Sequence, residues 1–271
     1  GSATVTVNTP QVALNDIAPV AICAGDSTTL TATTIGTVTG EVAYEWSPAT
    51  GLSSTIGATV TANPSETTIY TVTATATQGG CTATATDSVT VTVNALPTAT
   101  VSVTNVKCKG ASDGIITVNA TGGIGSYQYQ LGTGVFQNSN EFTGLNVGSY
   151  TLTVKDGNSC TTTTTATIDE PAQLTLTIVS VTDETCTGND GKINYTIAGG
   201  TAGTAGYTVV LSGGSANQTA NHTATGTYTF TGLKAGTYTV TVTDGNTCEA
   251  TATDTITLNN NFTVSASNTA I

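Results

Sequence analysis

Residues 148–160 read Gly-Ser-Tyr-Thr-Leu-Thr-Val-Lys-Asp-Gly-Asn-Ser-Cys, and residues 236–248 read Gly-Thr-Tyr-Thr-Val-Thr-Val-Thr-Asp-Gly-Asn-Thr-Cys. In both stretches apolar residues alternate with threonine or another polar residue, which predicts a strand with one buried and one exposed face. The Asp-Gly-Asn that follows predicts a hairpin turn, because Gly and Asn tolerate positive φ. The chain is therefore expected to be all-β.

The two stretches end two copies of a longer unit. The first copy starts at Cys108 and the second at Cys186, and both run through Cys-x-Gly, Asp-Gly, Gly-Gly and Phe-Thr-Gly-Leu in the same order. Repetition at such a period indicates an array of similar domains. The abundance of threonine and valine, which suit a pleated sheet, agrees with this interpretation. We predict three tandem, small antiparallel β-sandwich (Ig-like) domains in an extended rod.

The domain ranges follow from the repeat. Residues 98–172 and 173–258 are the two copies, and residues 11–97 form a different β-sandwich. Residues 1–10 are expected to end a preceding domain or linker, because they resemble the stretch 88–97. Residues 259–271 are expected to start a following repeat, because they resemble the first strand of the second copy.

Six cysteines allow 15 disulfide pairings. Each predicted domain holds one cysteine near its start and one near its end, so the repeat favours pairing within each domain. These predicted bonds are Cys23–Cys81, Cys108–Cys160 and Cys186–Cys248. Each would close a loop of about 50 to 60 residues and contribute roughly 4 kcal/mol. Paired cysteines in small β-domains indicate an oxidising compartment.

The long pattern from Cys-x-Gly to Asp-Gly-Asn-x-Cys, followed by Ile-x-Glu-Pro at 168–171, resembles the SprB-type repeat of gliding and surface adhesins in Bacteroidota. The resemblance covers residues 98–258. Tyr44-Glu-Trp46-Ser-Pro in the first range, with Cys23 and Cys81, is similar to PKD-like and Ig-like domains.

This resemblance implies a fragment of a large repetitive adhesin, displayed on the outer membrane after type IX secretion. The implied roles are surface attachment and gliding motility. The implied partners are extracellular surfaces or polysaccharides and neighbouring repeats of the same chain. The alternative from another class is a carbohydrate-binding accessory module of a secreted protein.

Charge excludes other partners. The formal net charge is −12 with only five lysines and arginines together, whereas a nucleic-acid surface needs clustered cations. The chain has no apolar run of the roughly 20 residues that a membrane span needs, so no membrane insertion is expected in this stretch.

Candidate site residues are few. Gly110-Ala-Ser112-Asp-Gly114 matches the G-x-S-x-G nucleophile pattern, but that motif needs a helix and a histidine base, so we expect no enzyme and no catalytic residue. Calcium is the one cofactor considered, at weak candidate ligands near the predicted domain junctions: Asp169, Glu170, Asp183 and Glu184. For carbohydrate, the weak candidates are aromatic side chains beside the Gly-Gly turns: Tyr127, Tyr129 and Tyr207.

Overall fold

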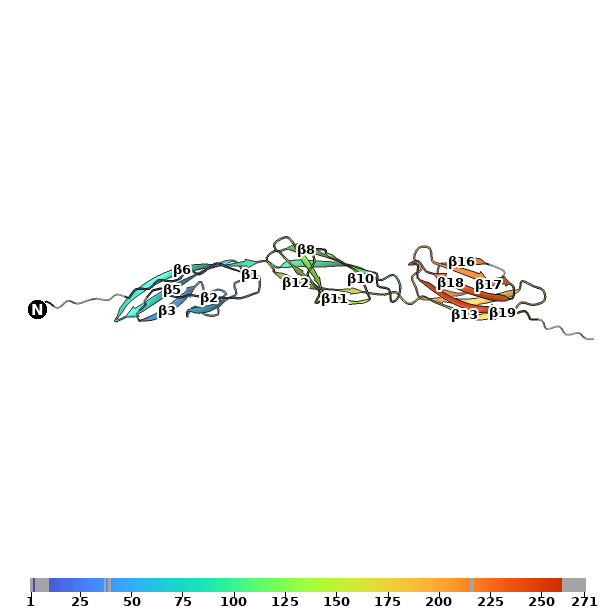
Figure 1. The fold of residues 1–271 in the computed structure, drawn as a ribbon, viewed down its shortest axis with the longest axis horizontal. Coiled ribbons are helices and arrows are strands. Elements are labelled where there is room, and N and C mark those ends of the chain that lie inside the picture. The colour runs from blue at the N-terminus through green and yellow to red at the C-terminus, as the bar shows by residue number, and fades with distance from the viewer. Residues whose placement is uncertain (1, 3–9, 37, 39, 215–216, 260–271) are drawn as a thin grey trace, which may run out of the picture. The chain divides into compact units, whose positions relative to one another are not determined.

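The chain consists of strands and turns. The computed structural model describes residues 2, 10–36, 38, 40–214 and 217–259, and it contains no helix among them (Figure 1). The prediction of an all-β chain is confirmed. The predicted end pieces, 1–10 and 259–271, lie outside the described residues except for residues 2, 10 and 259.

Strands pair within three consecutive segments, each with two sheets. The strands of the first segment are β1 (Val20–Cys23), β2 (Thr28–Thr31), β3 (Glu41–Ser47), β4 (Thr59–Ala62), β5 (Thr68–Gln78) and β6 (Cys81–Asn94). Those of the middle segment are β7 (Pro97–Thr104), β8 (Gly114–Gly122), β9 (Gln128–Leu131), β10 (Glu141–Leu145), β11 (Gly148–Lys155) and β12 (Thr161–Ile168). Those of the third are β13 (Thr175–Thr182), β14 (Gly191–Ala198), β15 (Tyr207–Gly213), β16 (Gln218–His222), β17 (Gly226–Leu233), β18 (Gly236–Thr243) and β19 (Glu249–Ile256).

In the first segment, the sheet β1-β6-β5-β3 packs on the pair β2-β4. The sequence predicts strands at residues 27–33, 42–46, 58–62, 68–77 and 82–93 of this segment, and a strand is present in each of these ranges. The sequence pattern missed β1, which pairs with β6 in parallel. Trp46 and Tyr70 are buried in the core between the sheets. The resemblance to Ig-like domains implies that Trp46 packs on a Cys23–Cys81 bond. This expectation is wrong, because Cys81 is exposed and unpaired.

In the third segment, the sheets β13-β14-β17 and β16-β15-β18-β19 enclose one core. Tyr238, Val240 and Val242 point inward and alternate with threonines, as the sequence predicts. The threonines of neighbouring strands pair on the outer face; for example, the hydroxyls of Thr239 and Thr253 lie 3.1 Å apart. Alternation thus buries the apolar residues and leaves threonine ladders outside.

The middle segment repeats this plan with the sheets β10-β8-β7 and β12-β11-β9. Leu152 and Val154 are buried, as are Ile116 and Val118 on β8, so its strands alternate in the same way. Gly114 has no room for a side chain, since a Cβ there would lie 2.8 Å from the carbonyl oxygen of Leu145. The glycine of the shared Asp-Gly therefore lets the start of β8 pack closely against the backbone of Leu145.

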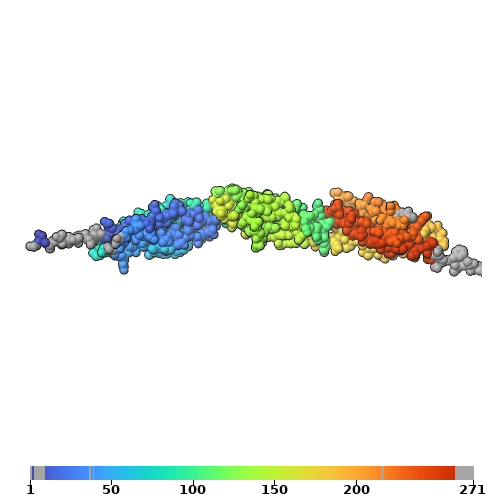
Figure 2. Space-filling view, in the orientation of Figure 1, coloured from blue at the N-terminus to red at the C-terminus, as the bar shows by residue number. Residues whose placement is uncertain are grey.

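The chain forms two compact units, and the division between them passes through the middle segment. The first unit comprises Gly1–Thr100, Val118–Asn140 and Thr151–Thr164. The second comprises Val101–Thr117, Glu141–Tyr150 and Thr165–Ile271. In the second unit, the green residues around 105–115 lie directly against the third segment (Figure 2).

Candidate functional site: two linker-spanning disulfides

Four cysteines form two disulfides, and neither is a bond that the repeat predicts. Cys23 is bonded to Cys160, with Cα atoms 5.5 Å apart, and Cys108 to Cys248, with Cα atoms 5.7 Å apart. Cys81 and Cys186 are unpaired and exposed. The three predicted pairings, Cys23–Cys81, Cys108–Cys160 and Cys186–Cys248, are therefore wrong. Each observed bond joins one segment to the next, and each lies within one compact unit.

The length of a strand explains why Cys23 does not reach Cys81. Cys23 is in register with Asn94, the last residue of β6, whereas Cys81 is the first residue of that strand. Thirteen steps (from 81 to 94) at 3.3 Å each separate the two positions by about 43 Å. A disulfide needs Cα atoms within about 7 Å.

The third segment separates its cysteines in the same way. Cys248 directly precedes β19, and Cys186 lies near that strand's other end, where Glu184 bridges in parallel to Leu258. Ten steps along the strand (from 248 to 258) span about 33 Å. All three segments of the described chain follow one arrangement. The earlier cysteine lies at the end of the segment's last strand, and the later cysteine lies at the start of that strand.

We name these positions by that order. The first cysteines are Cys23, Cys108 and Cys186, each followed by x-Gly, and the second cysteines are Cys81, Cys160 and Cys248. The chain leaves a segment beside its first cysteine and enters the next segment beside that segment's second cysteine. Short linkers, residues 95–96 and 169–174, connect these points, so a first cysteine meets the second cysteine of the following segment.

A buried aspartate shapes the loop of each bonded second cysteine. One carboxylate oxygen of Asp244 accepts N–H bonds from Asn246 and Cys248 at 2.9 Å each, and the other accepts from Thr201 at 2.8 Å. Asp156 is bonded in the same way by residues 124, 158 and 160. Both aspartates are about 5% exposed. Since a Cβ on Gly200 would lie 2.8 Å from the Asp244 carboxylate, the Gly-Gly turn is needed for this approach.

An exposed aspartate shapes the loop of the first cysteine. The N–H of Lys107 donates to Asp113 Oδ1 at 3.1 Å, which turns the chain around Cys108. Gly110 has φ 75°, a left-handed conformation that glycine adopts without strain. The Asp-Gly that the two repeats share thus helps to position Cys108 for its disulfide.

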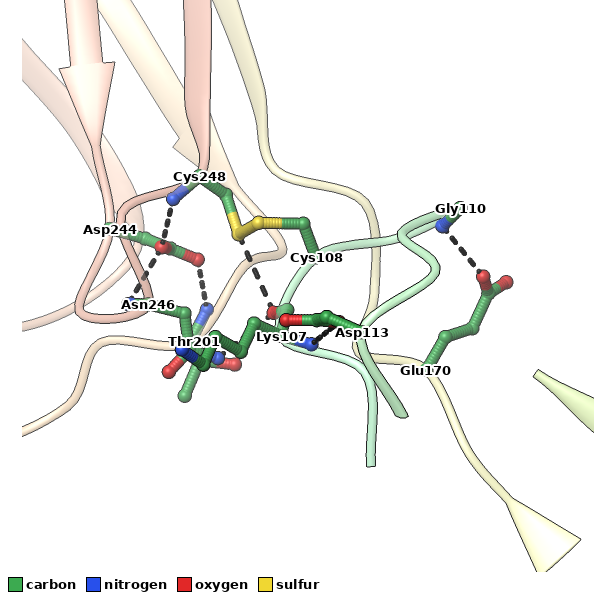
Figure 3. Close-up of a disulfide and its surroundings, with 9 residues drawn as sticks. All are labelled: Lys107, Cys108, Gly110, Asp113, Glu170, Thr201, Asp244, Asn246 and Cys248. Atoms are coloured by element: carbon green, nitrogen blue, oxygen red, sulfur yellow. Dashed lines mark hydrogen bonds between the residues drawn. A yellow bond between two sulfur atoms is a disulfide. The ribbon is translucent and has the colours of Figure 1, made fainter. Parts of the chain in front are cut away.

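Polar contacts join the loop of Cys108 both to the loop of Cys248 and to the second linker (Figure 3). The carbonyl oxygen of Lys107 accepts a bond from Asn246 Nδ2 at 2.9 Å and lies 3.5 Å from Cys248 Sγ. On the other side of the loop, Gly110 donates its N–H to Glu170 Oε2 at 3.0 Å, and Lys109 Nζ lies 3.8 Å from Glu170 Oε1. The joint therefore combines one covalent bond with several polar ones.

The predicted calcium ligands have protein partners in the structure. Asp183 accepts a bond from the N–H of Thr257, and the two oxygens of Glu184 accept from the N–H groups of Asn189 and Ala235. These bonds lower the pKa of both carboxyl groups. Glu170 is held as described above, while Asp169 uses its backbone, accepting from Val106. In the described part of the chain, no three acidic, histidine or cysteine side chains cluster as a metal site.

The candidate carbohydrate tyrosines have structural partners. Tyr207 and Tyr129 are buried, and Tyr127 is half-buried. The hydroxyls of Tyr127 and Tyr207 donate to the carbonyls of Gly122 and Gly199, the first glycines of the two Gly-Gly turns. This arrangement supports the turns beside the second cysteines and leaves no stacked aromatic platform at these residues.

An aromatic cluster on the third segment was not foreseen. The ring of His222 stacks on Tyr228 with centroids 3.5 Å apart, and its Nε2 lies 2.8 Å from the hydroxyl of Tyr195. Partial burial lowers the pKa of His222, and burial raises the pKa of Tyr195 to about 12. His222, the chain's single histidine, is therefore engaged with aromatic partners, not with a serine.

Comparisons with known proteins agree with the repeat analysis. A model of the SprB repeat matches residues 100–136. No sequence among curated proteins matches the chain. No described helix is long and apolar enough to cross a membrane.

Solved structures of tandem domains are similar at low scores. Titin domains I67–I69 are 14% identical, with 93% of this chain and 99% of that chain covered and a TM-score of 0.40. The three N-terminal domains of the bacteriophage RB49 outer capsid protein Hoc are 16% identical, with 92% and 99% covered and a TM-score of 0.36. A structure from a 1.5-MDa bacterial ice-binding adhesin is 18% identical, with 93% and 99% covered and a TM-score of 0.33.

Proposed function

We propose that the chain is a load-bearing piece of a repetitive cell-surface adhesin, and that its linker-spanning disulfides keep it short under tension. Two observations support this proposal: the SprB repeat at residues 100–136, and the disulfides that join successive segments. The disulfides support the mechanical part of the proposal, because two bonds that each span a linker limit the extension of three segments.

The two bonds overlap along the chain. Cys108 lies inside the loop closed by Cys23 and Cys160, and Cys160 lies inside the loop closed by Cys108 and Cys248. If every strand separated, three stretches of chain would connect one disulfide to the other in parallel: 23–108, 108–160 and 160–248. The shortest would carry the load while the other two stayed slack. Tension would then release far less chain than the whole length.

The loops also stabilise the folded state. Closing a loop of about 140 residues restricts the unfolded chain by roughly 5 kcal/mol on the chain-entropy estimate. The sequence separations here are 137 and 140. Small sandwiches with thin cores gain much from such a term.

We further propose an extracellular location, because persistent disulfides require an oxidising compartment. Type IX export, display on the outer membrane and a part in gliding are the finer points that the SprB resemblance implies. The proposed partners are surfaces or polysaccharides outside the cell. We assign no catalysis, since His222 is bound to aromatic groups and Ser112 lies in the loop of Cys108.

Surface labelling of intact cells that express the parent protein tests this function. An antibody against this chain should stain whole cells, and a maleimide that cannot cross membranes should label no more than two cysteines of this stretch. Cells whose protein carries Cys108→Ser and Cys248→Ser should detach from glass or polysaccharide at lower shear than cells with the wild-type protein. A cytoplasmic protein with six reactive thiols would overturn the proposal.

A further inference from the structure

Cys186 is a first cysteine without its bond. The other two first cysteines, Cys23 and Cys108, are each bonded to the second cysteine of the following segment. Cys186 is exposed and unpaired. Cys186 is therefore the one first cysteine of the described residues that lacks the bond to a following segment that Cys23 and Cys108 both have.

The loop around Cys186 already has the bonded conformation. The N–H of Thr185 donates to Asp190 Oδ1 at 2.8 Å, as Lys107 donates to Asp113 beside Cys108. Gly188 has φ 78°, and its equivalent Gly110 has φ 75°. The backbone around Cys186 thus has the conformation found around the bonded Cys108.

The chain leaves the third segment beside this thiol. The N–H of Asn259 donates to the carbonyl of Glu184 at 2.7 Å, and the thiol of Cys186 lies 3.9 Å from the carbonyl oxygen of Asn259. The N–H of Glu184 also donates to the carbonyl of Thr257, the first residue after β19, at 2.9 Å. The middle segment has the equivalent bond, from the N–H of Val106 to the carbonyl of Asp169, the first residue after β12. A module that starts after Asn259 would begin next to the sulfur atom.

We propose that Cys186 is the attachment site for a further module of this repeat, whose Asp-Gly-Asn-x-Cys turn supplies the second sulfur. Cys81 is an unpaired second cysteine and would bond to the first cysteine of a preceding module. It is the first residue of β6, the last strand of its segment, just as Cys160 and Cys248 immediately precede β12 and β19. The disulfide pattern of the chain would then extend in both directions. The inference rests on the disulfides and the loop geometry, and it holds whether or not the chain adheres to anything.

Bond formation is an oxidation. The thiols of Cys186 and the incoming cysteine lose two protons and two electrons and form one S–S bond. A low-molecular-weight or protein disulfide accepts the electrons and protons and is released as two thiols. The linker keeps the two thiols close, so the bond should form at protein concentrations too low for links between separate chains.

A fused extra module tests the proposal. In the full chain, residues after Asn259 are replaced by a copy of residues 172–258 that carries two mass tags, Thr187→Ser beside its first cysteine and Thr247→Ser beside its second. The middle segment has Ser159 at the position of Thr247. The protein is oxidised in a glutathione buffer, its free thiols are counted with a maleimide, and its disulfides are mapped without reduction.

We expect two reactive thiols, Cys81 and the Cys186 of the copy, which is the number expected for the unextended chain. The map should show the untagged Cys186 of the original chain bonded to the tagged Cys248 of the copy. A copy with Cys248→Ser should give three reactive thiols. Four reactive thiols in the fusion, or a bond between the copy's own two cysteines, would overturn the inference.

Two further measurements keep the result interpretable. If the added copy does not fold, as shown by circular dichroism, a copy of residues 97–172 replaces it, and Cys186 should then bond to the added Cys160. The unextended chain at the same concentration should stay monomeric on a non-reducing gel. Multimers linked through Cys81 and Cys186 that form as fast as the bond in the fusion would show that the linker does not select the partner.

Discussion

Pulling the chain by its two ends measures how much of it the disulfides hold back. Between residues 23 and 248 the unfolded backbone has 225 steps, or about 790 Å at 3.5 Å each. With both disulfides intact, the shortest covalent route crosses Cys23–Cys160, follows the 52 steps from 160 back to 108, and crosses Cys108–Cys248. That route extends to about 180 Å.

Single substitutions give intermediate lengths. Cys248→Ser leaves the route from 160 to 248, which has 88 steps and extends to about 310 Å. Cys23→Ser leaves the route from 23 to 108, which has 85 steps and extends to about 300 Å. Magnetic tweezers with attachment points outside residues 23–248 can resolve these lengths, and a reductant in the buffer should restore about 790 Å in every variant.

Cys186→Ser is the decisive control. In the structure this cysteine is unpaired, so the oxidised variant should keep the wild-type length of about 180 Å. If the cysteines instead paired within segments, the wild-type protein would have almost the same length, because 27 steps (from 81 to 108) and 26 steps (from 160 to 186) would remain free. The substitution would then release 62 more steps and lengthen the route to about 400 Å. That longer extension would show that the cysteines pair within segments.

Three further predictions concern the third segment. Asp244→Asn should lower its free energy of unfolding in urea by about 2 kcal/mol, because an amide oxygen cannot replace the carboxylate that accepts three buried N–H groups. Asp254→Asn, at an exposed side chain of β19, should change it by less than about 0.5 kcal/mol. The pKa of His222 is lowered in the folded state, so below about pH 6.5 the unfolded state binds more protons than the folded state, and the melting temperature should fall between pH 7.5 and pH 5.5. His222→Phe should remove that decrease. The same decrease of the melting temperature in the variant would contradict the role of His222. Glu184→Gln should weaken the loop of Cys186, seen as faster amide exchange at the two N–H groups that bond this carboxylate. In the wild-type protein the same loss of protection should appear as the pH falls below about 4.3, the pKa of Glu in the unfolded state, because the folded state lowers the pKa of Glu184. Equal exchange rates in both proteins at pH 7 would contradict the role of the carboxylate.

Much of the fold was predictable from local patterns. Alternation at 148–154 and 236–242 predicted β11 and β18, because the period-two burial of a sheet is visible in the sequence. The Asp-Gly-Asn triplets predicted turns for the same local reason. Strand β1 was missed because Val20–Cys23 is too short to show a period, and its parallel partner lies about 70 residues away.

The disulfide pairing was not predictable from counting cysteines, because it depends on the end of the sandwich at which each cysteine lies. The signal that could have placed them is strand direction. In the first and third segments the parallel contacts β1–β6 and Glu184–Leu258 show that the stretch before the first cysteine runs alongside the end of the last strand. The first cysteine then lies at the exit, while the second, before that strand, lies at the entrance. With a last strand of eight or more residues, a bond within the segment is out of reach. Counting the cysteines of the repeat suggested a disulfide within each domain. Once strand direction is known, the same repeat indicates a disulfide from each segment to the next segment.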